Sequence, residues 1–414
     1  MSQNASSKDR QAFVEDKREV ATTLNAESRR ILLDLVPSSA GGQSKRAAAF
    51  LNRFRYYDNR SSLIVVRQTG AVPFLSNTDN TRVIDVVLPP GSFRALRRIL
   101  WQNLLIPGLI RRYHVDTYIS FSHYLPRSMP RGIETIIGVS NLAPFSREAI
   151  KAETSFSRRF RLWALKNMTL SSARRASKVV ALSETCREIL IAHRIAAGKI
   201  VVIPNGVDAP MGSAFPKTGL ATKYGITGEY LLYVSNFHRY KNFERLVDGY
   251  VKLPATLRDR FTLVLVGHPD DPEYFTEVEG RINRAGIAQR VKVIPGLKEA
   301  ELGALYANTT LFIFPSLIET CPNILLEAMS YGAPVLTGNN NPMPEFAGNA
   351  ARYFDPLSAE SIAQQIIETV SAPQQLEDMR QASLTRAQRY TWDDFTAKIT
   401  SLYEKSTVGY RPNI

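Results

Sequence analysis

Residues 313–335 read IFPSLIETCPNILLEAMSYGAPV, and this stretch decides the fold that we expect. An apolar strand, Leu311–Phe314, leads into a polar turn that carries Glu319. Residues Asn323–Ser330 then have the pattern of a helix, and a glycine and a proline follow it. A strand that runs through a short turn into a helix is the repeating unit of α/β domains, so the stretch predicts an α/β fold.

The start of this helix is suited to binding an anion. The first N–H groups of a helix have no acceptor inside it and lie at the positive end of its dipole. We therefore expect the N–H groups of Asn323 and Ile324 to contact a phosphate. Glu327, deeper in the helix, suits the two hydroxyls of a ribose, and Glu319 at the rim suits the hydroxyls of a sugar. The alternative is an ordinary strand–loop–helix unit with two solvated glutamates.

Glu319 and Glu327 enclose seven residues, and the phrase resembles the E-x7-E motif of retaining glycosyltransferases of the large group 1 family. Those enzymes have two Rossmann-like halves, the GT-B fold. The resemblance is close over residues 200–400 and loose before them, and it is nearest to enzymes that build O-antigens and exopolysaccharides with mannose or rhamnose. Other segments that resemble the family, in the same order, are VVIPNGVD (201–208), YLLYVSNFHRYKNFERLVDGY (230–250), LVLVGH (263–268), VKVIPGLKEAELGALYANTTLFIFPS (291–316) and PMPEFAGNAARYFDP (342–356).

The length of 414 residues is too great for one core and predicts two domains. We expect residues 1–205 to form an acceptor-side Rossmann-like domain, in which residues 1–28 are a mobile polar tail. Residues 206–388 are expected to form a nucleotide-sugar-binding Rossmann-like domain. The resemblance implies that residues 389–414 form a C-terminal helix that crosses back to the first domain.

Strand and helix patterns alternate in both halves, which predicts parallel sheets facing each other across a cleft. The predicted strands of the first half are residues 30–36, 62–67, 82–88, 117–121, 134–139 and 178–182. Those of the second half are residues 200–203, 230–234, 261–266, 291–294, 311–314 and 334–336. The clearest helices are residues 43–54, 323–330 and 391–405, the last with Trp392, Phe395, Ile399 and Tyr403 on one face.

The net charge of +14 belongs to the first half of the chain. Residues 1–205 carry 32 Lys and Arg against 15 Asp and Glu, whereas the remaining residues carry 20 against 23. A basic half indicates an anionic partner such as nucleic acid, an anionic bilayer or an acidic substrate, or only a solvated surface. Nucleic acid is disfavoured, because no binding motif appears and aromatic residues do not interleave with the basic runs.

Two basic segments of the first half are amphipathic. Residues 156–178 include Trp163, and residues 92–112 carry a longer set of apolar side chains. Such helices can lie in a bilayer interface or pack on their own sheet, and both interpretations remain open. The apolar side chains of residues 92–112 are Phe93, Leu96, Leu100, Trp101 and Leu104.

Two distant cysteines, Cys186 and Cys321, indicate a reducing compartment without a disulfide framework or a cysteine metal site. No apolar leader and no stretch of membrane-spanning length is visible. We expect a cytoplasmic protein, peripheral on the inner face of the membrane.

Lys241 follows the strand at 230–234 and lies at the mouth of the next helix, where a lysine can neutralise a diphosphate. The resemblance implies that it is the lysine of an R-x4-K pair that clamps the donor diphosphate. Asn236 stands at the arginine position, and Arg239 is a candidate to supply the missing charge.

Gly41 and Gly42 let the backbone approach a ligand closely, and the resemblance implies that their loop faces the donor across the cleft.

Two further positions depart from the family pattern. Pro322 stands where the family usually has a glycine, and it lacks an N–H although it suits a first helical turn. Ser140 and Asn141 stand where many members have a His-Asp pair. They can bind hydroxyls but cannot act as a strong base. His123 is an alternative acceptor-side group or a structural histidine.

We predict a retaining hexosyltransferase for cell-surface polysaccharide or lipopolysaccharide synthesis, with neither a cofactor nor a metal. Its donor would be a GDP-, UDP- or dTDP-linked sugar, and its acceptor a glycan or a polyprenyl-linked sugar. Lys241 would stabilise the departing diphosphate, and Glu319 would hold the sugar without acting as a covalent nucleophile. Two alternatives are a sugar-nucleotide epimerase, which would need acid–base groups at the cleft, and a non-catalytic partner subunit, which would explain Asn236 and Ser140-Asn141.

Overall fold

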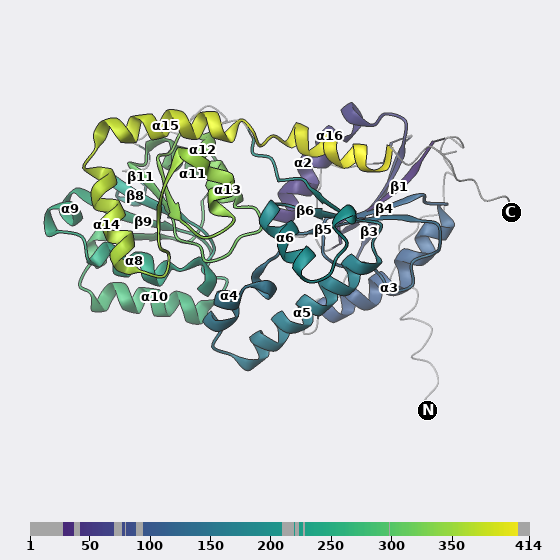
Figure 1. Cartoon of the computed structure of the whole chain (residues 1–414), viewed down its shortest axis with the longest axis horizontal. Helices are drawn as coiled ribbons and strands as arrows, with labels where there is room; N and C mark the ends of the chain where they lie inside the picture. The colour runs from purple at the N-terminus through teal and green to yellow at the C-terminus, as the bar shows by residue number, and fades with distance from the viewer. Residues whose placement is uncertain are drawn as a thin grey trace.

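The computed structural model describes residues 28–36, 42–69, 77–78, 80–87, 94–208, 219, 223–226, 228–297 and 299–404. Of the predicted features, the tail up to residue 27, Gly41, Phe93 and the end of the chain from residue 405 lie outside these residues, as does the side chain of Leu96. The described strands form two parallel sheets, which lie side by side in Figure 1.

The first sheet has seven described strands in the order β3-β2-β1-β4-β5-β6-β7. Alternate residues of β1, the third strand in this order, fall in separate cores, with Ile31 and Leu33 on one side and Leu32 on the other. Both faces of the sheet are therefore covered, as parallel sheets require. The strands are β1 (Arg30–Asp34), β2 (Ser62–Gln68), β3 (Thr81–Val86), β4 (Thr117–Ser120), β5 (Glu134–Val139), β6 (Lys178–Ala181) and β7 (Ile200–Val202).

The second sheet has six described strands in the order β10-β9-β8-β11-β12-β13. Its strands are short runs of buried aliphatic and aromatic residues such as FTLVLV in β9, which favour a central parallel strand. They are β8 (Glu229–Val234), β9 (Phe261–Val266), β10 (Val291–Ile294), β11 (Leu311–Phe314), β12 (Val335–Gly338) and β13 (Ala351–Phe354).

Both sheets reverse their strand order at one point, between β1 and β4 in the first and between β8 and β11 in the second. Ligands of open α/β sheets bind beyond the carboxyl ends of the strands at such a point. The turns that follow β8 and β11 carry Lys241 and Glu319. The topology therefore brings these two residues to one crevice.

Two strand predictions need correction. The strand at 200–203, which we grouped with the second half, pairs with β6 in the first sheet, where Val202 is the partner of Ala181. The strand Ala351–Phe354 was not predicted, because only four residues carry it and three of them are half-buried.

Helices join the strands and cover the sheets (Figure 1). In the first half they are α2 (Gly42–Tyr57), α3 (Arg94–Arg112), α4 (Arg147–Ala152), α5 (Phe156–Arg175) and α6 (Glu184–Ala192). In the second half they are α8 (Phe243–Val251), α9 (Ala255–Arg260), α10 (Pro272–Arg284), α11 (Glu299–Asn308), α12 (Asn323–Ser330), α13 (Met343–Ala347), α14 (Ala359–Val370), α15 (Pro373–Ala387) and α16 (Trp392–Glu404).

The C-terminal helix α16 crosses back to the first sheet and lies along α2, as predicted (Figure 1). Its apolar face enters the core beneath β1, where the rings of Phe395 and Phe121 lie 5.8 Å apart. At the crossing, the N–H of Val207 donates to the carbonyl of Tyr390. A Cβ at Gly206 would lie 2.1 Å from the nitrogen of Trp392, so only glycine fits where the two segments meet.

Within the described ranges, none of the helices combines the length and the apolar character that crossing a membrane requires.

Candidate functional site

Three neighbouring cavities form one groove between the two sheets. They measure about 290, 550 and 350 Å³, and each shares lining residues with the next. The first and second share Lys45 and Glu327, the second and third share Lys241 and Glu319, and Asn323 lines all three. The groove is therefore continuous, and it contains both glutamates of the E-x7-E phrase.

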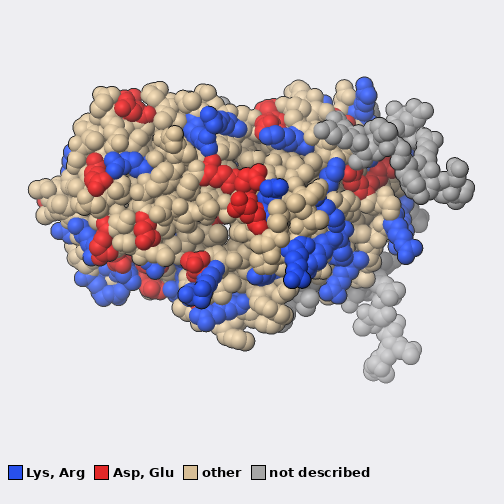
Figure 2. Space-filling view, in the orientation of Figure 1, with Lys and Arg blue, Asp and Glu red and all other residues tan. Residues whose placement is uncertain are grey.

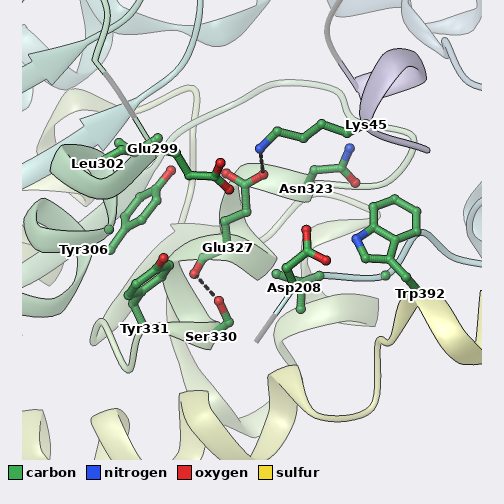
Figure 3. Close-up of a pocket in the computed structure, with 13 residues that line it drawn as sticks. Lys45, Asp208, Glu299, Leu302, Tyr306, Asn323, Glu327, Ser330, Tyr331 and Trp392 are labelled. Carbon is green, nitrogen blue, oxygen red and sulfur yellow. Dashed lines mark hydrogen bonds and ion pairs between the residues drawn. The ribbon is translucent and has the colours of Figure 1, made fainter. Parts of the chain in front are cut away.

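Figure 3 shows the first cavity, in which Lys45 of α2 reaches across to Glu327 of α12. Their Nζ and Oε1 atoms are 2.6 Å apart. Burial acts against the charge of Lys45, but the nearby Glu327 carboxylate raises the pKa of Lys45 above its ordinary value. The rings of Tyr306 and Tyr331 line the same cavity. The carboxylate that we expected to bind ribose thus faces a lysine of the first domain.

The centre of the groove holds a second lysine–glutamate pair. Lys241 ends a short 3₁₀ turn (Arg239–Lys241) before α8, and its Nζ lies 2.5 Å from Oε1 of Glu319. Ser316 donates a second hydrogen bond to the same oxygen at 2.8 Å. Only 12% of the Lys241 side chain and 13% of the Glu319 side chain is exposed. Burial opposes the charge of Lys241, but Glu319 raises the pKa of Lys241 above its ordinary value, so the amine stays protonated.

Asn242 fixes the turn that presents Lys241. It has a left-handed backbone with a φ of 65°, which asparagine tolerates better than most residues. Its buried side-chain amide donates to the carbonyls of Pro315 and Pro356. These two bonds tie the turn after β8 to the segments that follow β11 and β13.

The helix α12 begins at Asn323, as predicted, and Pro322 precedes it as the N-cap. The N–H of Asn323 donates to the carbonyl of Cys321 at 2.9 Å. The N–H of Ile324 has no acceptor among the residues that the structure describes. Of the two predicted phosphate donors, Ile324 is therefore the one that this conformation leaves available.

The third cavity brings the predicted acceptor-side residues Ser140 and Asn141 to the same groove. Gln43 of α2 donates to the hydroxyl of Ser140 at 2.7 Å. The side-chain oxygen of Asn141 accepts from the N–H of Ala143 at 2.9 Å. Both residues therefore lie within the cavity that Lys241 and Glu319 line.

Two predicted residues, Asn236 and Arg239, have partners at the margin of the groove or outside it. Asn236 lines the second cavity, but its amide donates to Asp270 at 2.7 Å. Arg239 pairs with Glu277 of α10 at 2.8 Å, so the charge that we expected it to supply is engaged elsewhere. Gly42 begins α2, and Gly41 lies outside the described residues.

His123 lines none of the three cavities. Both of its ring nitrogens are buried and have no hydrogen-bond partner among the described residues. Burial, helped by the charge of Arg98, lowers the pKa of His123 to about 4. The imidazole is therefore neutral at pH 7, and the structure does not bring it to the groove.

Sequence reasoning missed the contributions of α2 to the groove. Lys45 lines the first two cavities, and Arg46 lines the third. A signal was present in the sequence, because the two cations come shortly after Gly41 and Gly42, on the first turns of the helix. The prediction for this segment concerned only the approach of the glycine backbone to the ligand and left out the side chains that follow.

The two amphipathic segments form α3 and α5. Trp101 is buried in the core at 6% exposure, so of the two interpretations that the sequence left open, this side chain packs on its own sheet. Trp163 is 59% exposed and stacks on the exposed ring of Phe160 at 5.5 Å. A cavity of about 590 Å³ lies between the two helices, with Leu100 and Trp163 in its lining. Figure 2 shows Lys and Arg side chains gathered over this part of the molecule, in the lower right.

Family comparisons match both halves of the chain. Residues 40–209 match the model described as Glycosyltransferase Family 4, and residues 222–386 match the model described as Glycosyl transferases group 1. Together the two matches account for most of the described residues.

Curated relatives of the chain include mannosyltransferases. The chain is 24% identical to the O-antigen chain mannosyltransferase B of Escherichia coli over 303 residues, which are 71% of this chain and 76% of that protein. It is 27% identical over 229 residues to the serotype-specific mannosyltransferase WbdA of Escherichia coli. That match covers 54% of this chain but only 28% of WbdA.

Solved structures with the same fold cover nearly the whole chain. WaaG, a glycosyltransferase involved in lipopolysaccharide biosynthesis, superposes with a TM-score of 0.69 at 16% identity, over 92% of this chain and 100% of that one. HepE of Anabaena, solved in complex with UDP-glucose, gives a TM-score of 0.69 at 19% identity, over 91% of this chain and 99% of that one. These likenesses support the two-sheet architecture.

Proposed function

Because the chain belongs to the GT-B glycosyltransferases of group 1, we propose that it transfers a hexose, with retention, from a nucleotide sugar to a glycan or lipid-linked acceptor. The observation that carries this proposal is the groove in which Glu327, Lys241 and Glu319 lie in succession. Its relatives among O-antigen mannosyltransferases support a role in cell-surface polysaccharide synthesis and favour mannose as the sugar.

The nucleotide would lie along the first two cavities. Glu327 offers acceptors for the ribose hydroxyls once Lys45 releases it, and Tyr306 offers an aromatic surface beside it. The free N–H of Ile324 and the charged Lys241 would then meet the diphosphate. HepE, a neighbour in fold, was solved with UDP-glucose, which supports a nucleotide sugar as the donor.

The sugar would lie in the third cavity, between Glu319 and the Ser140-Asn141 segment. Glu319 is the one carboxylate among the described residues that line this cavity, and Lys241 and Ser316 hold it. No strong base faces it from Ser140 or Asn141. The leaving phosphate oxygen would then take the proton of the attacking hydroxyl. As the new bond to the anomeric carbon forms, the bond to the phosphate breaks on the same face, and the configuration is retained.

Electrostatic stabilisation of the leaving group needs no metal in this proposal. Positive charge at the diphosphate would come from the buried Lys241 ammonium and from the start of α12. The GDP, UDP and dTDP sugars remain alternative donors.

The place of action would be a membrane surface, where lipid-linked acceptors lie. The helices α3 and α5 together contain eleven Lys and Arg and no Asp or Glu. They also expose Leu100, Leu104, Phe156, Phe160 and Trp163. Apolar side chains among basic ones are the composition of a surface that binds anionic bilayers reversibly.

A donor panel tests the proposed function. The full chain is incubated with GDP-, UDP- and dTDP-linked sugars and a polyprenyl-linked acceptor, and release of each nucleoside diphosphate is measured with and without EDTA. We expect one donor class to be consumed, at the same rate in the chelator. Loss of turnover in EDTA that manganese restores would overturn the metal-free part, and no turnover with any donor would favour a non-catalytic partner subunit.

A further inference from the structure

We infer that Arg46 binds the terminal phosphate of the nucleoside diphosphate from the first domain, and so completes a cation pair with Lys241 of the second domain. This inference rests on the proposed function and adds to it a binding residue from the opposite side of the groove. Three features of Arg46 support it, namely its burial without a countercharge, its place in the groove and the way in which it is held.

Arg46 is a buried cation whose described partners are all neutral. Its side chain, on the first turns of α2, is 3% exposed. Its Nε donates to the amide oxygen of Asn205 at 2.7 Å, and its Nη1 donates to the carbonyl of Phe121 at 3.3 Å. No carboxylate in the described part of the chain forms an ion pair with it, and burial lowers the pKa of Arg46 to about 10. A buried charge without a countercharge is unfavourable unless a ligand supplies one.

The groove offers such a ligand. Arg46 lines the same 350 Å³ cavity as Lys241 and Glu319, and it does so from the opposite domain. None of the described residues accepts a hydrogen bond from its Nη2. A guanidinium has five donors in a planar fork, which suits two oxygens of one phosphate. Arg46 and Lys241 would therefore hold the departing phosphate from two sides.

A chain of hydrogen bonds orients the guanidinium toward the start of α12. Asn205 accepts from Arg46 through its oxygen and donates through its Nδ2 to Oδ1 of Asn323 at 2.8 Å. Asn323 is the first residue of α12, next to the free N–H of Ile324. Arg46 is thus held at the end of the helix where a phosphate is expected.

The inference also bears on the departure at Asn236, which stands at the arginine position of the diphosphate clamp. Asn236 donates to Asp270 and Arg239 pairs with Glu277, so neither supplies a second cation to the groove in this conformation. Arg46 supplies that cation from a different element.

Calorimetry with nucleotides distinguishes direct phosphate binding from a structural role. The full-length wild type, Arg46→Gln and Arg46→Lys are titrated with GDP, UDP and dTDP and with the corresponding monophosphates. Arg53→Gln, on the same helix and paired with Asp393, is the matched control. Circular dichroism and melting temperature establish that each variant is folded.

We expect Arg46→Gln to weaken binding of the diphosphate at least tenfold while binding of the monophosphate changes less than twofold. Arg46→Lys should show an intermediate loss, because a lysine keeps the charge and lacks the fork. If Arg46→Gln does not fold, the affinities of Arg46→Lys for the two nucleotides test the inference instead. Arg53→Gln should bind both nucleotides as the wild type does.

If a folded Arg46 variant bound both nucleotides with the affinities of the wild type, the inference would be overturned and the proposed function would stay intact. Equal weakening of both nucleotides would overturn it as well, because it would mean that Arg46 only positions Asn205 and Asn323. If the wild type bound no nucleoside diphosphate, the proposed function would fail and the inference with it.

Discussion

At the scale of single residues, the groove is organised by two lysine–glutamate pairs. Lys45 with Glu327 joins the two domains, and Lys241 with Glu319 lies inside the second domain. Each glutamate offers oxygens that a sugar nucleotide would use, and each lysine occupies them in this structure. In the proposed function, donor binding would exchange these contacts for new ones, so mutation of one partner alone would change binding through the other as well.

Replacement of Glu327 should weaken nucleotide binding. We expect Glu327→Ala to cost about 1.5–3 kcal/mol of binding free energy, because charge-assisted hydrogen bonds to the ribose hydroxyls are lost. Calorimetry with the nucleoside diphosphate measures it. Lys45→Met breaks the same ion pair but leaves the Glu327 carboxylate free. The affinity of this variant for the nucleoside diphosphate should therefore be unchanged or higher. Equal loss in both variants would mean that the ion pair matters and that Glu327 does not touch ribose.

Because of His123, the free energy of unfolding should fall at acidic pH. An exposed histidine titrates near 6.5, whereas burial lowers the pKa of His123 to about 4. The unfolded chain therefore takes up the proton first, and the stability from the neutral ring is complete above pH 6.5 and lost as the pH falls toward 4. Between pH 7 and 4.5 we expect a loss of roughly 2 kcal/mol from this group. Urea unfolding of the wild type and of His123→Leu at pH 7 and pH 4.5 measures this loss. If the variant lost as much unfolding free energy at pH 4.5 as the wild type, the prediction would be refuted.

At the scale of elements, α3 and α5 do more than cover the first sheet, because they also expose large apolar side chains on their outer faces. The inner faces of these helices pack on the first sheet through residues such as Trp101 and Leu170. Their outer faces keep Phe160 and Trp163 stacked and exposed. The apolar side chains of these helices are therefore divided between a buried core and an exposed surface.

Loss of the stacked pair should reduce membrane binding. We expect the double variant Phe160→Ser and Trp163→Ser to bind anionic vesicles about tenfold more weakly at low salt, because burial of large apolar side chains in the interface is lost. Co-sedimentation of the full chain measures it. Leu357→Ser, which removes a 54% exposed side chain from the second domain, is the control and should have no effect. Equal binding by all three proteins would contradict the assignment of this surface.

Sequence predicted the elements nearest the site closely. The strand Leu311–Phe314 and the helix Asn323–Ser330 have the predicted bounds, because a short buried run and a helical pattern followed by a glycine and a proline leave little ambiguity. The burial of Trp101 was not predictable, because an amphipathic helix has the same pattern whether it faces a sheet or a bilayer. The pairing of Lys45 with Glu327 depends on residues 282 positions apart, which only the folded topology brings together.

At the scale of the whole molecule, the two domains are joined by contacts on both sides of the groove. The carboxylate of Glu345 accepts hydrogen bonds from the N–H groups of Glu184 and Thr185 at the start of α6. Arg158 of α5 pairs with Asp271, which caps α10. The crossing of the chain at Gly206 completes the connection.

A side chain at Gly206 should weaken that connection. We expect Gly206→Ala to lower the melting temperature of the full chain, with a cost of about 1–3 kcal/mol, because its Cβ would collide with the backbone of Trp392. Gly198→Ala is the matched control, since nothing lies within 4 Å of the Cβ that it adds. Calorimetric melting of both variants tests this prediction. Equal melting temperatures would show that the backbone at the crossing can accommodate the added Cβ without loss of stability.

The configuration of the transferred sugar tests the proposed retaining transfer most directly. Using the donor that the nucleotide panel identifies, NMR follows the anomeric signal of the first product formed by the wild type and by Glu319→Gln. We expect the product to keep the configuration of the donor. We also expect the variant to lose turnover while it binds the nucleoside diphosphate almost normally, because Glu319 is proposed to hold the sugar and not the nucleotide. A product of inverted configuration, or full turnover by Glu319→Gln, would contradict it.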